Sequence, residues 1–193
     1  MRLMILMLLV AAATLLQGCF PLAAVGVGAT AVVLTDRRSP GFYIEDESIE
    51  WKIRVQVIEG FKDAHINATS YNLAVLLTGQ VPTEDAKKAI EAAARSNPGV
   101  KNVTNEITVG GNSSLASCSS DSLVTTSVKA RLINNGKVSP SHVKVVTESG
   151  VVYLMGIVTR EEADAAAEIA RTTSGVTRVV KVFDYVDKVP PRG

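Results

Sequence analysis

The chain has 193 residues, with 20 Lys and Arg against 19 Asp and Glu and a formal net charge of +1 at pH 7. This near-neutral balance argues against a nucleic-acid-binding protein, because such domains are usually strongly basic. The length allows one larger domain or two small ones, and two cysteines are too few for a disulfide framework.

Residues 1–18 have the features of a secretory signal peptide. Arg2 precedes an apolar run over 3–16 that is short for a membrane span. The run ends in Leu16-Gln17-Gly18-Cys19, which resembles the lipobox of bacterial lipoproteins. That resemblance implies removal of residues 1–18, transfer of a diacylglycerol to the Cys19 thiol and acylation of its new amino group. The alternative is a plain signal peptide with an incidental cysteine.

Residues 19–44 are expected to form a lipidated tether. Residues 22–34 are apolar with small side chains and lack the basic face of an interfacial helix, which favours a weakly ordered segment. Residues 36–41 contain a Pro-Gly pair and are interpreted as a turn. If Cys19 carries lipid, Cys118 has no partner in the chain and is either an inert linker thiol or an intermolecular crosslink.

The remaining sequence contains an internal repeat. Residues 76–81 match residues 153–158, and His65-Ile66 matches His142-Val143, at the same separation along the chain. We therefore predict an α+β fold with two αββαβ domains, at 45–110 and 121–188. Each is expected to be a small mixed three-stranded sheet packed by two helices. A flexible Gly/Ser-rich linker at 111–120 and a tail at 189–193 complete the organisation.

Each repeat begins with a helix, for which Asp46 and Asp121 are candidate N-caps. Apolar residues recur every fourth position behind these caps and define a buried stripe. They are Ile49, Ile53 and Val57 in the first repeat, and Val124, Val128 and Leu132 in the second.

Two strands, a second helix and a third strand follow in each repeat. The strands are expected at 65–71, 73–81 and 100–109, then at 142–147, 151–158 and 176–186. Ser149-Gly150 marks a hairpin turn, and acidic pairs begin the second helices after Thr83 and at 161–162. Gly99 and Gly175 are expected to end these helices as left-handed caps. One face of each sheet receives the helices, and the other is left for solvent or for the partner repeat.

The second strands end in Gly79 and Gly156, and the third strands start with Gly-Val at 99 and 175. In this order, the segments 75–79 and 152–156 and the Gly-Val starts resemble the BON-domain family. Together with the lipobox, they resemble dual BON-domain outer-membrane lipoproteins, as do residues 36–38 and 125–132. The resemblance implies a periplasm-facing, lipid-anchored outer-membrane protein that supports envelope integrity. It also implies binding of anionic phospholipid by the second domain.

The two repeats differ in charge. Residues 45–110 hold 7 bases and 10 acids, a net of −3, whereas residues 111–193 hold 10 bases and 8 acids, a net of +2. An anionic membrane therefore favours the second repeat. Leu123 points away from the buried stripe of its helix and stands where the family can carry an aromatic residue. Its alternative role is a contact to the linker or first domain. The candidate phospholipid-binding residues are Leu123, Thr126, Ser127, Lys129, Ala130 and Arg131.

A second apolar stripe, formed by Trp51, Val55 and Ile58, projects from the first helix away from its core face. One interpretation is a protein interface, used by a structural adaptor that binds an outer-membrane assembly or division-site protein. The other is packing of one repeat on the other.

The sequence contains no catalytic constellation. His65 and His142 stand at equivalent strand starts, which favours a shared structural role over metal binding. Neither a Gly-x-Ser-x-Gly elbow nor a phosphate loop occurs. The acidic pairs at 84–85 and 161–162 are interpreted as solvated helix starts. We expect no enzyme activity, no metal, and no cofactor apart from the covalent lipid on Cys19.

Overall fold

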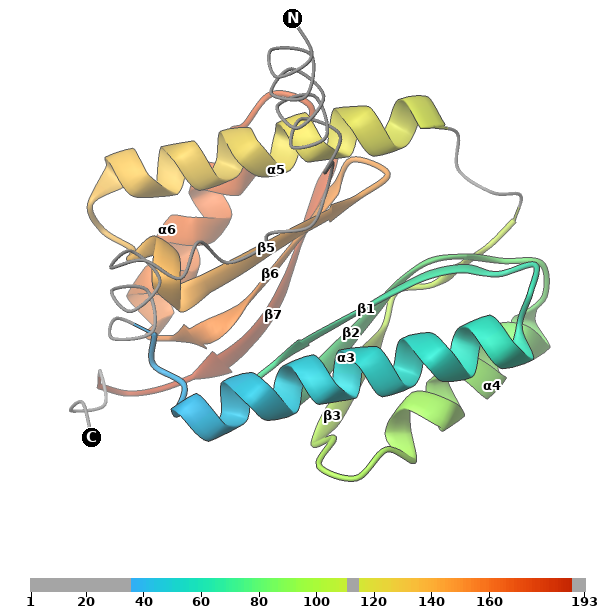
Figure 1. Ribbon diagram of the computed structural model, residues 1–193. Helices are drawn as coiled ribbons and strands as arrows, with labels where there is room; N and C mark the ends of the chain where they lie inside the picture. Colours follow the sequence, from blue (N-terminus) through green and yellow to red (C-terminus); the bar gives the residue numbers. More distant parts are fainter. Residues whose placement is uncertain (1–35, 111–114, 189–193) are drawn as a thin grey trace, which may run out of the picture. The chain divides into compact units, whose positions relative to one another are not determined.

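The computed structural model describes residues 36–110 and 115–188 (Figure 1). The lipidation motif at Cys19, the apolar segment 22–34 and the tail 189–193 lie outside these residues. The first repeat consists of α3 (Pro40–Gly60), β1 (His65–Tyr71), β2 (Ala74–Val81), α4 (Glu84–Arg95), β3 (Asn102–Asn105) and β4 (Thr108–Val109). The second consists of α5 (Leu115–Asn135), the short 3-10 helix η1 (Pro140–His142), β5 (Val143–Glu148), β6 (Val151–Val158), α6 (Arg160–Arg171) and β7 (Arg178–Tyr185).

Each repeat has a small mixed sheet, so the α+β prediction is confirmed. An antiparallel hairpin, β1-β2 or β5-β6, is extended on one side by a parallel strand. In the second repeat that strand is β7, and in the first it is divided into β3 and β4, which both pair with β2. The division occurs at Glu106 and Ile107, where the Ile107 amide donates to the Asn105 side chain rather than to β2. The first sheet therefore has four strands instead of the expected three.

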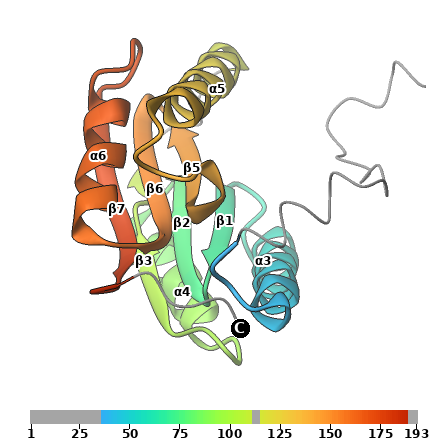
Figure 2. The same ribbon diagram turned by 90° about the vertical axis from the view of Figure 1, so that its left-hand side faces the viewer.

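The helices cover one face of each sheet, as expected from the apolar stripes. In both views α3 lies beside the first sheet and α5 beside the second (Figure 2). The predicted stripes of α3 and α5 are buried in two separate cores. The opposite sheet faces contribute Tyr71, Leu76, Tyr153 and Met155 to one further buried cluster. Packing against the partner repeat is thus what covers these sheet faces.

The N-cap prediction for Asp46 and Asp121 is wrong. Helix α3 begins six residues earlier, at Pro40, and Ser39 is its N-cap, with its hydroxyl accepting from the Phe42 amide. Both aspartates lie inside their helices and cap the β-hairpin turns instead. Asp46 is only 2% exposed and accepts from the Asn72 and Leu73 amides at 2.9 and 2.8 Å. These turn residues have positive φ, so their amides point away from the strand ladder and need another acceptor.

Asp121 does the same for the second hairpin, where it accepts from the Ser149 and Gly150 amides at 2.7 and 2.8 Å. Helix α5 extends upstream of Asp121 as α3 extends upstream of Asp46, and both helices have 21 residues. The segment Leu115–Ser120 is therefore helical, and the expected flexible linker over 111–120 is wrong for that part. The side chain of Cys118 lies outside the described part of the chain.

Gly79 and Gly156 permit close backbone approach, as predicted. A Cβ atom at Gly79 would collide with the carbonyl oxygen of His65, the first residue of the paired strand β1. A Cβ atom at Gly156 would collide with that of His142, which directly precedes the paired strand β5. Gly99 and Gly175 have φ of 90° and 87°, but they follow the helix ends at Arg95 and Arg171 by four residues. The prediction that they act as helix caps is wrong, because turn bonds such as Val100 N–H to Asn97 C=O intervene.

Candidate functional site

The outward face of α5 carries the residues expected to bind phospholipid. Leu123 is 70% exposed, opposite a helix face that Val124, Val128 and Leu132 fix in the core. Exposed neighbours share or border its side of the helix, namely Thr126, Ser127, Lys129 and Ala130. Ile133 extends the same face, is 64% exposed, and was missed by the sequence analysis. The exposed position of Ile133 could have been predicted, because it is three positions after Ala130 and does not belong to the buried stripe.

The hydroxyls on this face are satisfied by their own helix. Thr126 Oγ1 donates to the Ser122 carbonyl and Ser127 Oγ donates to the Leu123 carbonyl, each at 2.9 Å. Their polar hydrogens are therefore already bonded, and the groups turned outward are mainly methyl and methylene. A surface of this kind loses few hydrogen bonds when it leaves water.

The two basic residues beside this face have different environments. The Arg131 guanidinium donates to the Ile169 carbonyl at 2.8 Å and to the hydroxyls of Thr173 and Thr172 at 2.6 and 2.9 Å. Arg131 thus binds the C-terminal end of α6, where a cation also complements the helix dipole. Lys129 is exposed and makes no ion pair among the described residues. It is the cation that this face offers to a partner.

An open pocket of about 420 Å³ lies beside residues 121–126 of α5. Its lining includes Asp121, Glu148, Thr125 and Thr147. Glu148 also accepts a hydrogen bond from Asn67 of the first repeat at 3.2 Å. Two carboxylates make this pocket a poor site for a phosphate group, so the α5 face is the better candidate for anionic lipid.

In the first repeat, the outward face of α3 carries exposed apolar side chains. Trp51 is 63% exposed and Ile44 is 71% exposed, while Val55 is half-buried. Trp51 therefore does not pack on the second repeat, and the interpretation of this stripe as a contact between repeats is wrong for Trp51. The side chain of Ile58 lies outside the described part of the chain.

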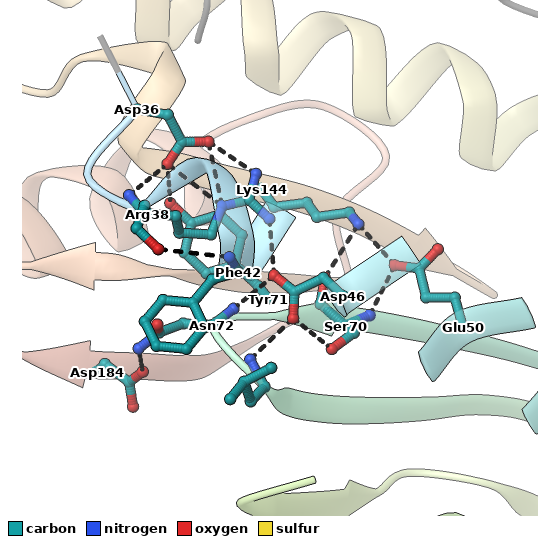
Figure 3. Close-up of polar contacts among 12 residues, drawn as sticks. Asp36, Arg38, Phe42, Asp46, Glu50, Ser70, Tyr71, Asn72, Lys144 and Asp184 are labelled. Atoms are coloured by element: carbon teal, nitrogen blue, oxygen red, sulfur yellow. Dashed lines mark hydrogen bonds and ion pairs between the residues drawn. The ribbon is translucent and has the colours of Figure 1, made fainter. Parts of the chain in front are cut away.

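The segment Asp36–Arg38, which we expected to be part of the tether, is bound to the folded domains. Arg38 donates to Asp36 and to Asp46, with its shortest contacts at 2.7 and 2.9 Å (Figure 3). Its guanidinium also lies 4.1 Å from the centre of the Tyr71 ring. Asp46 thus receives bonds from Arg38 and from the hairpin turn, and this links the segment to the first domain.

Burial shifts the acid-base equilibria of this cluster. Burial opposes the charge on Arg38, but its hydrogen bonds to Asp36 and Asp46 raise its pKa above the usual value. Burial and the nearby Asp36 carboxylate raise the pKa of Tyr71 beyond its usual range. The Arg38 guanidinium therefore stays charged and the Tyr71 phenol stays neutral over the whole physiological range.

Arg37 links the same segment to the second domain. Its guanidinium binds both carboxylate oxygens of Glu162 at 2.7 Å and donates to the Ile157 carbonyl at 2.7 Å. Glu162 also accepts from the Thr159 amide in the capping box of α6. Burial works against this carboxylate, but the bonds from Arg37 and Thr159 hold the pKa of Glu162 at about 2. The interpretation of Glu162 as a solvated helix-start residue is wrong.

From the sequence, residues 36–41 were interpreted as a turn, and the ion pairs of Arg37 and Arg38 were not predicted. A signal was present, because Asp36, Arg37 and Arg38 are the first charged residues after Arg2. Their partners, Asp46 and Glu162, are far apart in sequence, so the pairing becomes visible only in the fold.

Further polar contacts join the two repeats. The Lys144 ammonium binds Glu50 at 2.8 Å and the Ser70 carbonyl at 3.2 Å (Figure 3). The side-chain amide of Asn72 donates to Asp184 at 2.7 Å, also drawn in Figure 3. Together with the buried cluster of Tyr71, Leu76, Tyr153 and Met155, these contacts connect the two sheets.

The histidines have equivalent backbone positions, since each carbonyl faces a strand glycine. Their side chains differ, because His65 is exposed and His142 Nδ1 lies 3.8 Å from Glu162. Among the described residues, no group of three or more His, Cys, Asp or Glu could hold a metal ion. Within the same residues, no helix has the length and apolar character needed to cross a bilayer.

Comparison with known proteins identifies both repeats. The family model described as BON domain matches residues 45–111 and 120–187. Outer membrane lipoprotein DolP of Haemophilus influenzae is 44% identical over 186 residues, which cover 94% of this chain and 96% of that protein. The 21 kDa hemolysin of Actinobacillus pleuropneumoniae is 39% identical, covering 78% and 79% of the two chains. Osmotically-inducible protein Y of Escherichia coli is 28% identical over 72% of each chain.

These matches extend over both sheets and their helices, and they agree with the observed αββαβ order. The resemblance to dual BON-domain lipoproteins is therefore confirmed. The chain belongs to the BON-domain family and has a DolP-like arrangement of two such domains.

Proposed function

We propose that this protein is a non-enzymatic lipoprotein of the outer membrane, anchored through Cys19 and facing the periplasm. Its second BON domain binds anionic phospholipid through the outward face of α5 and supports envelope integrity. The similarity to an outer membrane lipoprotein and the Leu16–Cys19 motif support the anchor and the location. Apart from the lipid on Cys19, the proposal requires no cofactor.

The observation that carries the lipid-binding proposal is the exposure of Leu123, which lies in the interior of α5 on its outward face. Burying a Leu side chain contributes about 1.5–3 kcal/mol, and one Lys near an anionic surface contributes about 1 kcal/mol. Together these correspond to a dissociation constant of about 1–15 mM, which is weak in solution. A lipid anchor keeps the domain near the bilayer, so even weak docking can orient it there.

The test is binding of the lipid-free mature chain to anionic and neutral vesicles at millimolar lipid concentrations. Leu123→Glu is expected to abolish binding to anionic vesicles, because it places a carboxylate where the apolar contact forms. The matched control is Ser48→Glu, at the equivalent position of α3, which is expected to leave binding unchanged. Circular dichroism verifies that both variants are folded. Unchanged binding of the Leu123→Glu variant would remove α5 from the proposal.

A second candidate function is that of a structural adaptor, favoured by the exposure of Trp51 on α3. In this case the first domain uses Trp51, Val55 and Ile58 to bind an outer-membrane assembly or division-site protein. A photo-crosslinking amino acid at position 51 tests it in cells, with position 126 of α5 as the matched control. A crosslink to an envelope protein at position 51 alone supports the adaptor, and identical products at both positions contradict it.

A further inference from the structure

The outward face of α3 has the pattern of a coiled-coil seam. Ile44, Ser48, Trp51 and Val55 follow one another at alternating spacings of four and three residues. Ile44 and Trp51 are strongly exposed, and Val55 is half-buried. We call these four residues the α3 seam. They lie opposite the face that Ile49, Ile53 and Val57 bury in the first core.

Charged residues border the α3 seam in a regular order. One border carries Glu45 and then Lys52, and the other carries Glu47 and then Arg54. On each border the acid precedes the base by seven residues, which is two helical turns. All four side chains are exposed, and none of them forms an ion pair with another residue in the ranges 36–110 and 115–188.

This pattern is complementary to itself when a second α3 runs in the opposite direction. With a twofold axis between Ile49 and Glu50, the seam residue Ile44 faces Val55 of the second copy. Ser48 then faces Trp51, so a small side chain leaves room for the indole, whereas a parallel pairing would oppose two Trp51 rings. Across the borders, Glu45 meets Lys52 and Glu47 meets Arg54 of the second copy, which gives four attractive pairs.

We propose that α3 is a self-association surface, on which a second copy of this chain packs antiparallel through the α3 seam. The equivalent helix α5 serves as an internal comparison. The positions equivalent to Glu45, Glu47 and Lys52 are all serine in α5, and those equivalent to Trp51 and Val55 are Thr126 and Ala130. The self-complementary pattern is thus confined to α3, although both helices keep the same inward face.

A membrane is the less suitable occupant of this face. Glu45 and Glu47 border the seam, and the first repeat has a net charge of −3 over residues 45–110. An anionic bilayer repels such a surface. One helix face is small compared with a standard protein interface, so association in solution is weak, and anchoring on one bilayer raises the effective concentration.

Trp51 is the only tryptophan of the chain, so its fluorescence reports directly on the α3 seam. The full lipidated chain is reconstituted in phosphatidylcholine vesicles at increasing surface density. We expect the Trp51 emission to shift to shorter wavelength as the density rises. A blue shift already complete at one chain per vesicle would indicate insertion in the membrane and overturn the proposal, as would emission that stays at the exposed wavelength throughout.

Charge reversal then tests the antiparallel pairing. Glu45→Lys with Glu47→Lys is expected to weaken association at least tenfold, because each border becomes entirely basic. Adding Lys52→Glu and Arg54→Glu restores opposite charges in the antiparallel pairing and is expected to restore the density-dependent shift. Melting temperatures establish that each variant is folded. If the variant with all four charges reversed is folded but does not recover association, the antiparallel pairing is contradicted.

Discussion

Helices α3 and α5 occupy the same place in the two repeats, and their inward faces are nearly interchangeable. Each has three branched apolar residues, spaced four residues apart, and one buried aspartate that caps the hairpin turn. Their outward faces share almost nothing. In α3 that face is Ile44, Trp51 and Val55 with acids beside them, and in α5 it is mostly small or hydroxyl-bearing with Lys129 beside it.

This difference shows which constraints the fold places on a repeat. The inward face has to fill one core and satisfy one turn, and close packing leaves few solutions to that problem. The outward face is free of the core, so it can change when the two domains contact different partners. This difference is consistent with the proposed contact of α5 with lipid and of α3 with protein.

The largest effect is expected from the strand glycines, which the two repeats share. Gly156→Val puts a side chain against the His142 carbonyl oxygen and is expected to destabilise the protein by about 3–5 kcal/mol. Gly79→Val is expected to cost more, because Gly79 also has φ of 114°, which β-branched residues avoid. Thermal unfolding measures both. Gly110→Val, where nothing lies within 4 Å, is the control. Equal melting temperatures for all three would exclude the steric explanation.

Replacing the two hairpin-capping aspartates is expected to lower the free energy of unfolding by different amounts, because Asp46 has more hydrogen-bond partners than Asp121. Asp46→Ala removes one of the two carboxylates that bind Arg38 and leaves the Ser70 hydroxyl and two turn amides without their acceptor. We expect a loss of about 3–5 kcal/mol. Asp121→Ala removes bonds from the Ser149 and Gly150 amides, and we expect about 2 kcal/mol. Urea unfolding gives both values. An Asp121 variant as unstable as the Asp46 variant would show that the Arg38 pair adds nothing.

The pH dependence of stability is expected to distinguish the N-terminus of α6 in the second domain from that of α4 in the first. Glu162 has a pKa of about 2 in the folded protein, against an ordinary value of 4.5. A carboxyl whose pKa falls on folding stabilises the folded state above its unfolded pKa. That contribution disappears as the pH falls from about 4.5 to about 2 and amounts to about 1–3 kcal/mol. Glu162→Gln is expected to flatten the stability curve in this window.

The neighbouring Glu161→Gln is the matched control, because Glu161 is exposed and lies outside the Arg37 pair. Its stability curve is expected to follow that of the unchanged protein. The first domain has Ala86 at the equivalent third position of α4, so it contributes no such term. A curve that stays equally steep in the Glu162→Gln variant would place the acid sensitivity elsewhere.

The smallest effect concerns the two cations of α5. Lys129→Glu is expected to weaken binding to anionic vesicles about fivefold or more, from the loss of about 1 kcal/mol, and to reduce its dependence on salt. Arg131→Glu is expected to act mainly on stability, because its guanidinium binds the end of α6. Vesicle sedimentation and thermal unfolding separate the two roles. If both variants lost binding equally and had equal melting temperatures, Arg131 would belong to the lipid-binding surface after all.

Local pattern determined most of the secondary structure and the repeat itself. The spacing of apolar residues predicted the buried stripes of α3 and α5, and turn-forming residues predicted the Ser149-Gly150 hairpin. Helical faces and tight turns both depend on residues within a few positions of one another. The steric role of Gly79 and Gly156 was also predictable, since a strand glycine in a packed sheet commonly marks a close backbone approach. The exposed faces, including Trp51 and Leu123, followed from the helical period.

Tertiary structure decided what depends on distant partners. Asp46 and Asp121 have the local signature of N-caps, yet the amides that they satisfy belong to hairpin turns more than 20 residues away. Asp36–Arg38 has the local signature of a turn, yet its arginines pair with Asp46 and Glu162. Hydrogen bonds and ion pairs of this kind leave no periodic trace in the sequence, because they depend on which surfaces the packing of the two cores brings together.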